Sequence, residues 1–426
     1  MFKKLLCALI ACKAMLMGEW SSPLIIDQEF IALTPSLAIN SKGQAILVYS
    51  KKNKKKFTAI AKTKAPNSKW SKPFSLVKNG TRVIYPEVTI NSNGNAVAFW
   101  NYHPENDDRH LIQTYVLALG AKNWLPTNEL TPTFIKNDPL AQLSLDEEGN
   151  TYAVWINGNS IESAFLEKLS TMWQPITPLK LGYPSIFQDQ SLIVDNLGKA
   201  WALWTKGEDY YVGENVVVSP LSEKEGWNTP QVLAPEGKYY MFTTIACDSV
   251  GNLLTSWQLL DPNKSVIKRY DAMKHVWETT NFKQPLKGSG SLSITFDPAG
   301  NALCVYRDGN NLFSSTLPSG SLEWSEPICV TTDNVRDWRC SVDSKGNRML
   351  VWSGESIYLK SSMLLVNSTS WSAPMEVTRA DELIGTGLYG NGDGLIVFVN
   401  EQRLCSVTGS SLFNSNNAKK LRKAKA

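Results

Sequence analysis

The chain of 426 residues is long enough for two or three average domains, or for one large repeat domain. With 43% hydrophobic residues, 19% charged residues and 15 tryptophans, its composition supplies the apolar surface of a folded core and excludes a disordered protein. The formal net charge of +4 is small for this length, so we expect no specific nucleic-acid partner.

The first 18 residues have the pattern of an export signal. Two lysines precede a run at residues 5–17 that is apolar apart from Lys13 and is too short and too interrupted to span a bilayer. Two cleavage sites are open. An ordinary signal peptidase would cut near Gly18, whereas LIAC at residues 9–12 resembles a lipobox, in which Cys12 would be acylated. We therefore predict export to the bacterial periplasm, outer envelope or exterior, with peripheral or lipid-anchored membrane association as the alternative that depends on Cys12.

The most informative feature of the sequence is a repeat with a period of about 50 residues. Its first marker is Asp or Asn, followed three residues later by Gly and preceded by an alternating apolar run. This pattern predicts a tight turn, because Asp and Asn bond to the backbone two residues on and Gly takes a conformation that other residues resist. The eight copies begin at Asn40, Asn91, Asp146, Asp195, Asp248, Asp297, Asp343 and Asn391.

An aromatic residue follows the glycine of the marker six positions later in seven copies. These residues are Tyr49, Trp100, Trp155, Trp204, Trp257, Tyr306 and Trp352, and the eighth copy has Asn400 at this position. The residues between glycine and aromatic are apolar on both faces of the predicted strand. Such a strand is expected to lie between two packed sheets.

A second, independent marker is a tryptophan that usually has proline two or three residues later. It also occurs eight times, at Trp20, Trp70, Trp124, Trp173, Trp227, Trp277, Trp324 and Trp371. Each unit is therefore predicted to hold strand a before the turn, strands b and c after it, and strand d near the tryptophan. Four strands in about 50 residues are the proportion of a propeller blade, whereas the rungs of a β-solenoid repeat about every 20 to 30 residues.

The order of the markers predicts how the ring closes. The chain begins with a lone strand d and ends with strands a to c, so the termini should complete one blade and protect its edges. The predicted fold is all-β: an eight-bladed β-propeller of four antiparallel strands per blade, as a single domain over residues 19–412. A basic flexible tail is predicted at residues 413–426.

Two segments, DEEGNTYAVW at 146–155 and NSNGNAVAFW at 91–100, resemble the unit of secreted bacterial β-propeller repeat proteins, DxxGNAxAVW…W. The resemblance covers the chain from Trp20 to Ser410 and implies fold and export, but no chemistry. Similarity to sialidase-type propellers is distant, because the segments before the second tryptophan lack the full Asp-box and the Arg-Ile-Pro motif is absent. No catalytic residue is therefore transferred.

The loops that break the repeat are the predicted place of a ligand site. The a–b turns and c–d connections should lie on one face of the disc, which we call the turn face. The b–c and d–a loops vary in length and content and should form the other, the variable face. The candidate ligand-binding residues on the variable face are Arg82, Tyr85, His103, Asp107, Asp108, Arg109, Tyr239, Tyr240, Arg336 and Trp338.

Aromatic and charged side chains in the same loops suit a sugar or a peptide, although solvated loops and packing between blades explain them equally well. With three histidines and no regular His/Asp/Glu cluster, the sequence predicts no metal site, cofactor or catalytic triad. The leading hypothesis is a monomeric, non-enzymatic binding or scaffolding propeller of the cell envelope with a protein or glycan partner. The alternative is a glycan-active hydrolase or lyase at the channel mouth, using carboxylates such as Asp107, Asp108 and Glu208.

Five cysteines follow the predicted signal: Cys247, Cys304, Cys329, Cys340 and Cys405. Their odd number and wide spacing argue against a disulfide framework and a zinc site. We predict free, mostly buried thiols, with a bond between Cys329 and Cys340 as the open alternative.

Overall fold

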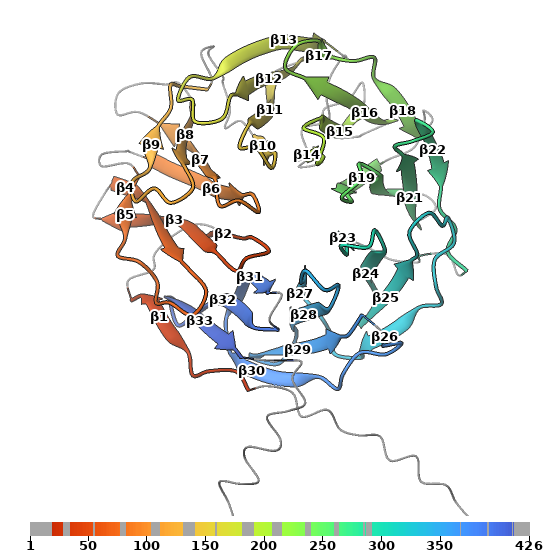
Figure 1. Cartoon of the computed structure of the whole chain (residues 1–426). Helices are drawn as coiled ribbons and strands as arrows, with labels where there is room; N and C mark the ends of the chain where they lie inside the picture. The colour runs from red at the N-terminus through yellow and green to blue at the C-terminus, as the bar shows by residue number, and fades with distance from the viewer. Residues whose placement is uncertain are drawn as a thin grey trace, which may run out of the picture.

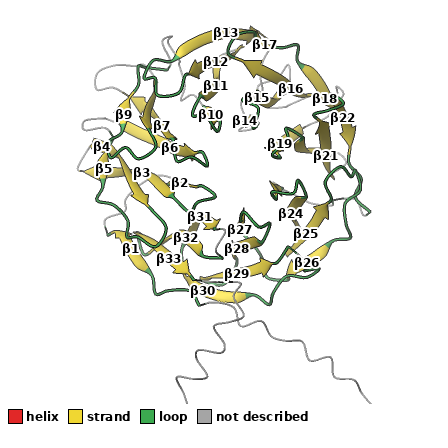
Figure 2. Cartoon of the chain, in the orientation of Figure 1, coloured by secondary structure: helices red, strands yellow, loops and turns green. Residues whose placement is uncertain are grey.

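The structure is a computed structural model that describes residues 19–28, 35–53, 56–76, 82–103, 111–130, 141–157, 160–180, 191–206, 215–234, 240–259, 264–283, 286, 292–366, 368–389, 392–410 and 412. These residues form 33 strands in eight antiparallel sheets around a central axis (Figure 1), and no helix lies among them (Figure 2). The described part thus contains no helix able to cross a membrane. The predicted signal at residues 1–18, with Cys12, and the predicted tail at 413–426 lie outside the described residues.

Blades 1 to 4 follow one another along the chain, each starting with its innermost strand. Blade 1 consists of β2 (Ser36–Ile39), β3 (Ala45–Asn53), β4 (Lys56–Lys64) and β5 (Phe74–Ser75). Blade 2 consists of β6 (Arg82–Ile90), β7 (Ala96–His103), β8 (Leu111–Leu117) and β9 (Leu125–Pro126). Blade 3 consists of β10 (Gln142–Leu145), β11 (Thr151–Asn157), β12 (Ser160–Leu166) and β13 (Gln174–Lys180). Blade 4 consists of β14 (Ser191–Val194), β15 (Ala200–Lys206) and β16 (Asn215–Ser222), with an outer strand split into β17 (Gly226–Trp227) and β18 (Gln231–Ala234).

Blades 5 to 7 repeat this order, and blade 8 draws on both ends of the propeller. Blade 5 consists of β19 (Tyr240–Cys247), β20 (Leu253–Leu259), β21 (Lys264–Asp271) and β22 (Val276–Thr279). Blade 6 consists of β23 (Ser293–Phe296), β24 (Ala302–Asp308), β25 (Asn311–Leu317) and β26 (Ile328–Thr331). Blade 7 consists of β27 (Asp337–Val342), β28 (Arg348–Ser353), β29 (Tyr358–Leu364) and β30 (Met375–Arg379). Blade 8 consists of β31 (Glu382–Leu388), β32 (Gly394–Asn400), β33 (Arg403–Gly409) and β1 (Leu24–Asp27).

The ring closes in blade 8, as the order of the markers predicted. The N-terminal strand β1 pairs antiparallel with β33, with Leu24 opposite Ser406, and Trp20 forms a further bridge to Gly409. An eight-bladed propeller of four-stranded blades, closed by the two termini, is therefore confirmed. Without β1, strand β33 would be an exposed edge of a three-stranded sheet. Pairing with β1 covers this edge and gives blade 8 the same four strands as the other blades.

The hydrophobic core is divided into eight clusters, one at each interface between neighbouring blades. The second strand of a blade serves two interfaces at once, because its side chains alternate between its faces. In β3, Leu47 packs toward blade 8, whereas Ile46 and Val48 pack toward blade 2. This position explains why the sequence is apolar on both faces of these strands.

The structure corrects the sequence alignment of blade 8. Its turn begins at Tyr389, whose carbonyl accepts a hydrogen bond of 2.8 Å from the N–H of Gly392. Gly392 has a φ of 83°, and the glycines of the other seven turns also have positive φ angles. Counting six residues from Gly392 leads to Phe398, which is 1% exposed and packs toward blade 7. The aromatic position is thus filled in all eight blades, and Asn400 is not its equivalent. Sequence spacing misaligned the copy because Tyr replaces Asp or Asn in this turn.

The tryptophans of the second marker join each blade to the one before it. Six of their indole N–H groups donate to a Ser or Thr hydroxyl of the preceding blade, over 2.8 to 3.2 Å: Trp20 to Ser361, Trp70 to Ser406, Trp173 to Thr114, Trp227 to Ser163, Trp324 to Thr280 and Trp371 to Ser314. A buried indole N–H needs such a partner. These residues therefore belong to the architecture rather than to a ligand site.

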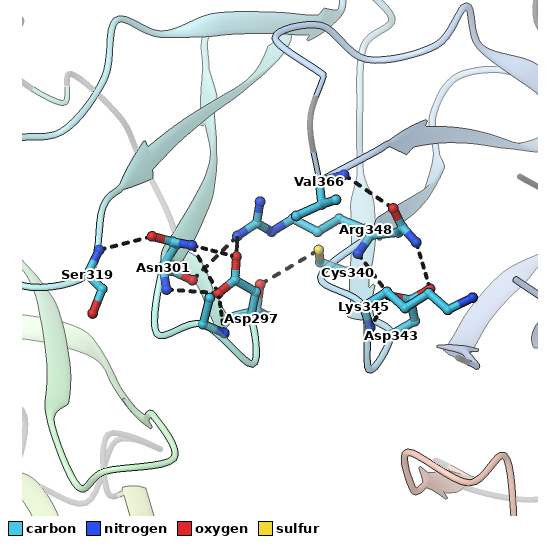
Figure 3. A network of polar contacts seen from close by, with 11 residues as sticks. Asp297, Asn301, Ser319, Cys340, Asp343, Lys345, Arg348 and Val366 are labelled. Atoms are coloured by element: carbon cyan, nitrogen blue, oxygen red, sulfur yellow. Dashed lines mark hydrogen bonds and ion pairs between the residues drawn. The ribbon is translucent and has the colours of Figure 1, made fainter. Parts of the chain in front are cut away.

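The turn residues and the asparagine after the turn glycine form a second set of structural bonds (Figure 3). In blade 6, Asn301 donates to the Asp297 carboxylate over 3.0 Å and accepts from the N–H of Ser319 over 3.0 Å, which ties the a–b turn to the c–d connection. Asp297 is also ion-paired with Arg348 of blade 7 at 3.1 Å, and both side chains are buried. The Asp-x-x-Gly-Asn motif thus reports packing on the turn face, not chemistry.

Candidate functional site

A hollow in the described part of the variable face lies between blades 6 and 7. It has a volume of about 440 Å³ and is lined by Asn310, Thr332, Asp333, Asn334, Trp352, Gly354, Glu355, Ser356, Tyr358 and Lys360. We call it the blade 6/7 pocket. Three connections build it: the β24–β25 turn, the segment from β26 to β27, and the β28–β29 loop. Its lining is polar apart from two aromatic rings, which suits a ligand with many hydroxyl or amide groups.

Asp333 is the central charged group of the blade 6/7 pocket. Its Oδ2 accepts bonds from the Lys360 ammonium at 2.9 Å and from the Trp352 indole at 3.2 Å. Burial by itself raises the pKa of the Asp333 carboxyl, but bonds to Lys360, Trp352 and Thr331 outweigh burial and leave its pKa below the usual range. The carboxylate is therefore held ionised in one orientation.

The rim of the pocket depends on a close approach between two loops. A side chain at Gly354 would place its Cβ 2.9 Å from the carbonyl oxygen of Asn334, so this position requires glycine. The Asn334 amide then donates to Glu355 across the same contact over 2.7 Å. Tyr358, at the start of β29, has 38% of its surface exposed beside this pair. A preformed rim with one accessible ring is the geometry of a small binding site.

A related arrangement occurs between blades 8 and 1. Asp27 at the end of β1 accepts from the Tyr49 hydroxyl at 2.9 Å and from the Lys51 ammonium at 2.9 Å. Tyr49 holds the same repeat position as Trp352, so in both places a carboxylate of one blade joins the aromatic and a lysine of the next. These bonds join neighbouring blades, and in the described residues they are found both between blades 8 and 1 and beside the blade 6/7 pocket.

The structure places the sequence-predicted site residues in three groups. Asp107, Asp108, Arg109 and Tyr239, and the side chains of Arg82 and His103, lie outside the described part, as does Glu208. Tyr240 and Trp338 are buried between blades, and the Trp338 indole donates to Ser293 over 3.0 Å. Arg336 and Tyr85 are exposed. The N–H of Arg336 bonds to the carbonyl of Ser353 at the edge of the blade 6/7 pocket, whereas Tyr85 lies on β6 in blade 2.

Sequence reasoning did not identify the residues that line the blade 6/7 pocket, and it did not identify the half-buried carboxyl of Glu87. Asp333, Glu355 and Lys360 are separated along the chain and carry no spacing that marks a site. Glu87 lies on the innermost strand β6 opposite Phe99, and burial raises the pKa of its carboxyl to about 7. The sequence signal that could have found it is a carboxyl residue in the middle of a predicted strand, flanked by Pro86 and Val88.

The five cysteines beyond the predicted signal are free thiols, so the structure does not support the alternative bond between Cys329 and Cys340. Cys304 and Cys405 are buried, Cys247 and Cys340 are partly buried, and Cys329 is exposed. Within the described ranges, no group of three or more His, Cys, Asp or Glu side chains is placed to hold a metal ion.

Comparison with known proteins identifies the fold only. No protein-family model and no curated protein matches the chain. The solved Dos1 propeller is 11% identical, with a TM-score of 0.51 over 94% of this chain and 96% of its own. A structure from a study of two prolyl endopeptidases is 10% identical, with a TM-score of 0.50 over 90% of this chain and 55% of its own. A protein of unknown function from Dyadobacter fermentans is 11% identical, with a TM-score of 0.44 over 92% and 99%. At 11% identity, the likeness to the Dos1 propeller shows the β-propeller fold alone.

Proposed function

We propose that this protein is an exported glycan-binding propeller whose variable face holds a saccharide in the blade 6/7 pocket. The observation that supports it is the combination of an oriented carboxylate, Asp333, with amide and hydroxyl groups and the partly exposed ring of Tyr358. Sugar hydroxyls bond to carboxylates and amides, and the apolar face of a sugar ring packs on an aromatic ring. A volume of about 440 Å³ is within the usual range for small-ligand pockets.

Binding fits the chemistry of this pocket better than hydrolysis. A glycosidase needs one carboxylic acid with a raised pKa to protonate the leaving oxygen. The pKa of Asp333 is instead lowered, and its Oδ2 is already engaged by Lys360 and Trp352. This carboxylate is arranged to accept hydrogen bonds from a ligand, not to deliver a proton.

The test is a glycan array probed with purified protein, followed by calorimetric titration of the best hit. Asp333→Asn and Tyr358→Ala should each weaken binding by about tenfold, equivalent to roughly 1.4 kcal/mol. The matched control is Asp27→Asn, which alters a carboxylate with the same kinds of partner, an aromatic side chain and a lysine, between blades 8 and 1 and away from the blade 6/7 pocket. Equal binding by wild type and both pocket variants, or equal losses in Asp27→Asn, would contradict the proposal.

A second candidate function, a glycan-active enzyme at the channel mouth, has support from Glu87 alone. A pKa of about 7 is suited to a general acid, and Glu87 lies on the innermost strand of blade 2. If this function holds, wild type should cleave the glycans found on the array, and Glu87→Gln should form no cleavage product. Intact glycans after incubation with wild type would exclude it for those glycans.

Export rests on the signal-like pattern of residues 1–18. Fractionation of cells that express the full chain should place the protein outside the cytoplasm, and metabolic labelling with a fatty-acid probe should mark wild type but not Cys12→Ser if Cys12 is acylated. A cytoplasmic protein would refute export, and an exported but unlabelled protein would favour cleavage near Gly18.

A further inference from the structure

Two exposed aromatic residues occupy the same repeat position on different blades. Tyr85 lies six residues before the turn residue Asn91, and Phe242 lies six residues before Asp248. Their rings are substantially exposed, with 49% of the surface of Tyr85 and 42% of that of Phe242 accessible. Large exposed aromatics are uncommon on a strand that lies next to the axis of a packed ring.

Both residues adopt a backbone conformation that bulky side chains rarely take. The φ angle is 51° at Tyr85 and 56° at Phe242. Each lies in a β-bulge opposite the tryptophan of the second strand, where the pairing shifts between Ile84 and Glu87 in blade 2 and between Met241 and Thr244 in blade 5. Left-handed backbone costs free energy in a non-glycine residue, and bulges re-aim side chains beside functional sites.

The other described copies of this position show that the repeat does not require the distortion. The equivalents in blades 7 and 8 are Asp337 and Leu383, and neither has a positive φ. Leu383 is buried, as expected for a residue that only packs. The left-handed conformation therefore coincides with an exposed aromatic ring in the two blades that have one.

The two rings belong to strands on opposite sides of the central channel. β6 and β19 are the innermost strands of blades 2 and 5, and Figure 1 shows them on opposite sides of the ring of blades. Both strands run from the variable face to the turn face, and the aromatics lie in the half nearer the variable face. Between these blades, β10 and β14 start with the half-buried neutral residues Gln142 and Ser191, and the Ser191 hydroxyl donates to the carbonyl of Thr243 over 3.4 Å.

We infer that the channel mouth on the variable face is a second binding site, where Tyr85 and Phe242 are stacking platforms for a neutral saccharide chain. Exposed aromatic residues on the innermost strands of two blades, with Gln142 and Ser191 on the innermost strands of the two blades that separate them, match the apolar faces and hydroxyl edges of sugar rings. A peptide ligand is the competing occupant, and the test includes it. The inference shares its ligand class with the proposed function but involves none of the residues of the blade 6/7 pocket.

The binding test uses the folded full chain and four variants: Tyr85→Ala, Tyr85→Gly, Phe242→Ala and the double alanine variant. The probes are chitohexaose, cellohexaose, maltohexaose and a proline-rich decapeptide, titrated by calorimetry. For at least one hexasaccharide we expect a roughly tenfold loss of affinity per ring removed, and about hundredfold in the double variant. Wild type that binds no hexasaccharide, variants that bind as wild type, or an effect confined to the decapeptide would each overturn the inference.

Comparison of Tyr85→Gly with Tyr85→Ala separates a ligand role from a structural one. Glycine accepts a φ of 51° without strain, so Tyr85→Gly should unfold at an equal or higher urea concentration than Tyr85→Ala although both lose the ring. If both variants bind weakly while Tyr85→Gly unfolds no earlier than wild type, the strained tyrosine is kept for the ligand. If Asp333→Asn abolishes binding and the channel variants do not, this inference fails while the blade 6/7 pocket stands.

Discussion

The half-buried carboxyl of Glu87 gives a quantitative test of the structure through the pH dependence of stability. Burial raises its pKa from the ordinary 4.5 to about 7, because ionisation next to the interface of blades 2 and 3 is penalised. The folded chain therefore binds this proton more tightly than the unfolded chain does. The penalty is absent below pH 4.5, grows as the pH rises to 7, and is then constant.

The size of the penalty follows from the two pKa values. Each pKa unit corresponds to about 1.4 kcal/mol, so their separation amounts to about 3.5 kcal/mol, as an upper limit that water entry or side-chain movement would reduce. Glu87→Gln removes the ionisation and keeps the shape. We expect its free energy of unfolding to be close to that of wild type at pH 4.5, and higher than that of wild type by up to about 3.5 kcal/mol at pH 8.

Urea unfolding followed by tryptophan fluorescence at pH 4.5, 6 and 8 measures this difference directly. Glu148→Gln, at an exposed position in the turn of blade 3, is the matched control and should leave the pH profile of wild type unchanged. A difference between Glu87→Gln and wild type that is the same at all three pH values would refute the reasoning, because only an ionisation produces the trend.

Three further predictions concern packing and thiol exposure. Arg348→Ala should lower the free energy of unfolding by about 3 to 5 kcal/mol in urea titrations, because it leaves a buried carboxylate unpaired; a loss under 1 kcal/mol would argue against the buried pair. Phe398→Ala should lower the free energy of unfolding by about 3 to 5 kcal/mol, whereas Asn400→Ala should lower it by under about 1 kcal/mol. A larger loss in Asn400→Ala than in Phe398→Ala would support the alignment based on sequence spacing instead. Mass spectrometry after brief maleimide labelling of the folded chain should find Cys329 modified and Cys304 unmodified, since only the former is exposed; equal labelling would contradict the packing of blade 6.

Much of the fold could be predicted from sequence because its signals are local. An Asp or Asn turn with its glycine, and an aromatic at a fixed distance, define one hairpin, and eight such hairpins count the blades. The marker failed only in blade 8, where Tyr389 takes the place of the turn residue and Phe398 must be located by its packing. A pattern search cannot see that Tyr389 makes the same backbone bond as an aspartate would.

The candidate sites required the tertiary structure because their parts come from different blades. Lys360 and Asp333 are 27 residues apart and meet only because blade 7 packs against blade 6. The strain at Tyr85 and Phe242 is a backbone property that residue type does not reveal. The sequence by itself determined the number of blades, their strand order and the closure of the ring, since these depend on spacing along the chain. The tertiary structure decided which charges, rings and strained residues meet on the variable face, since those contacts depend on how neighbouring blades pack.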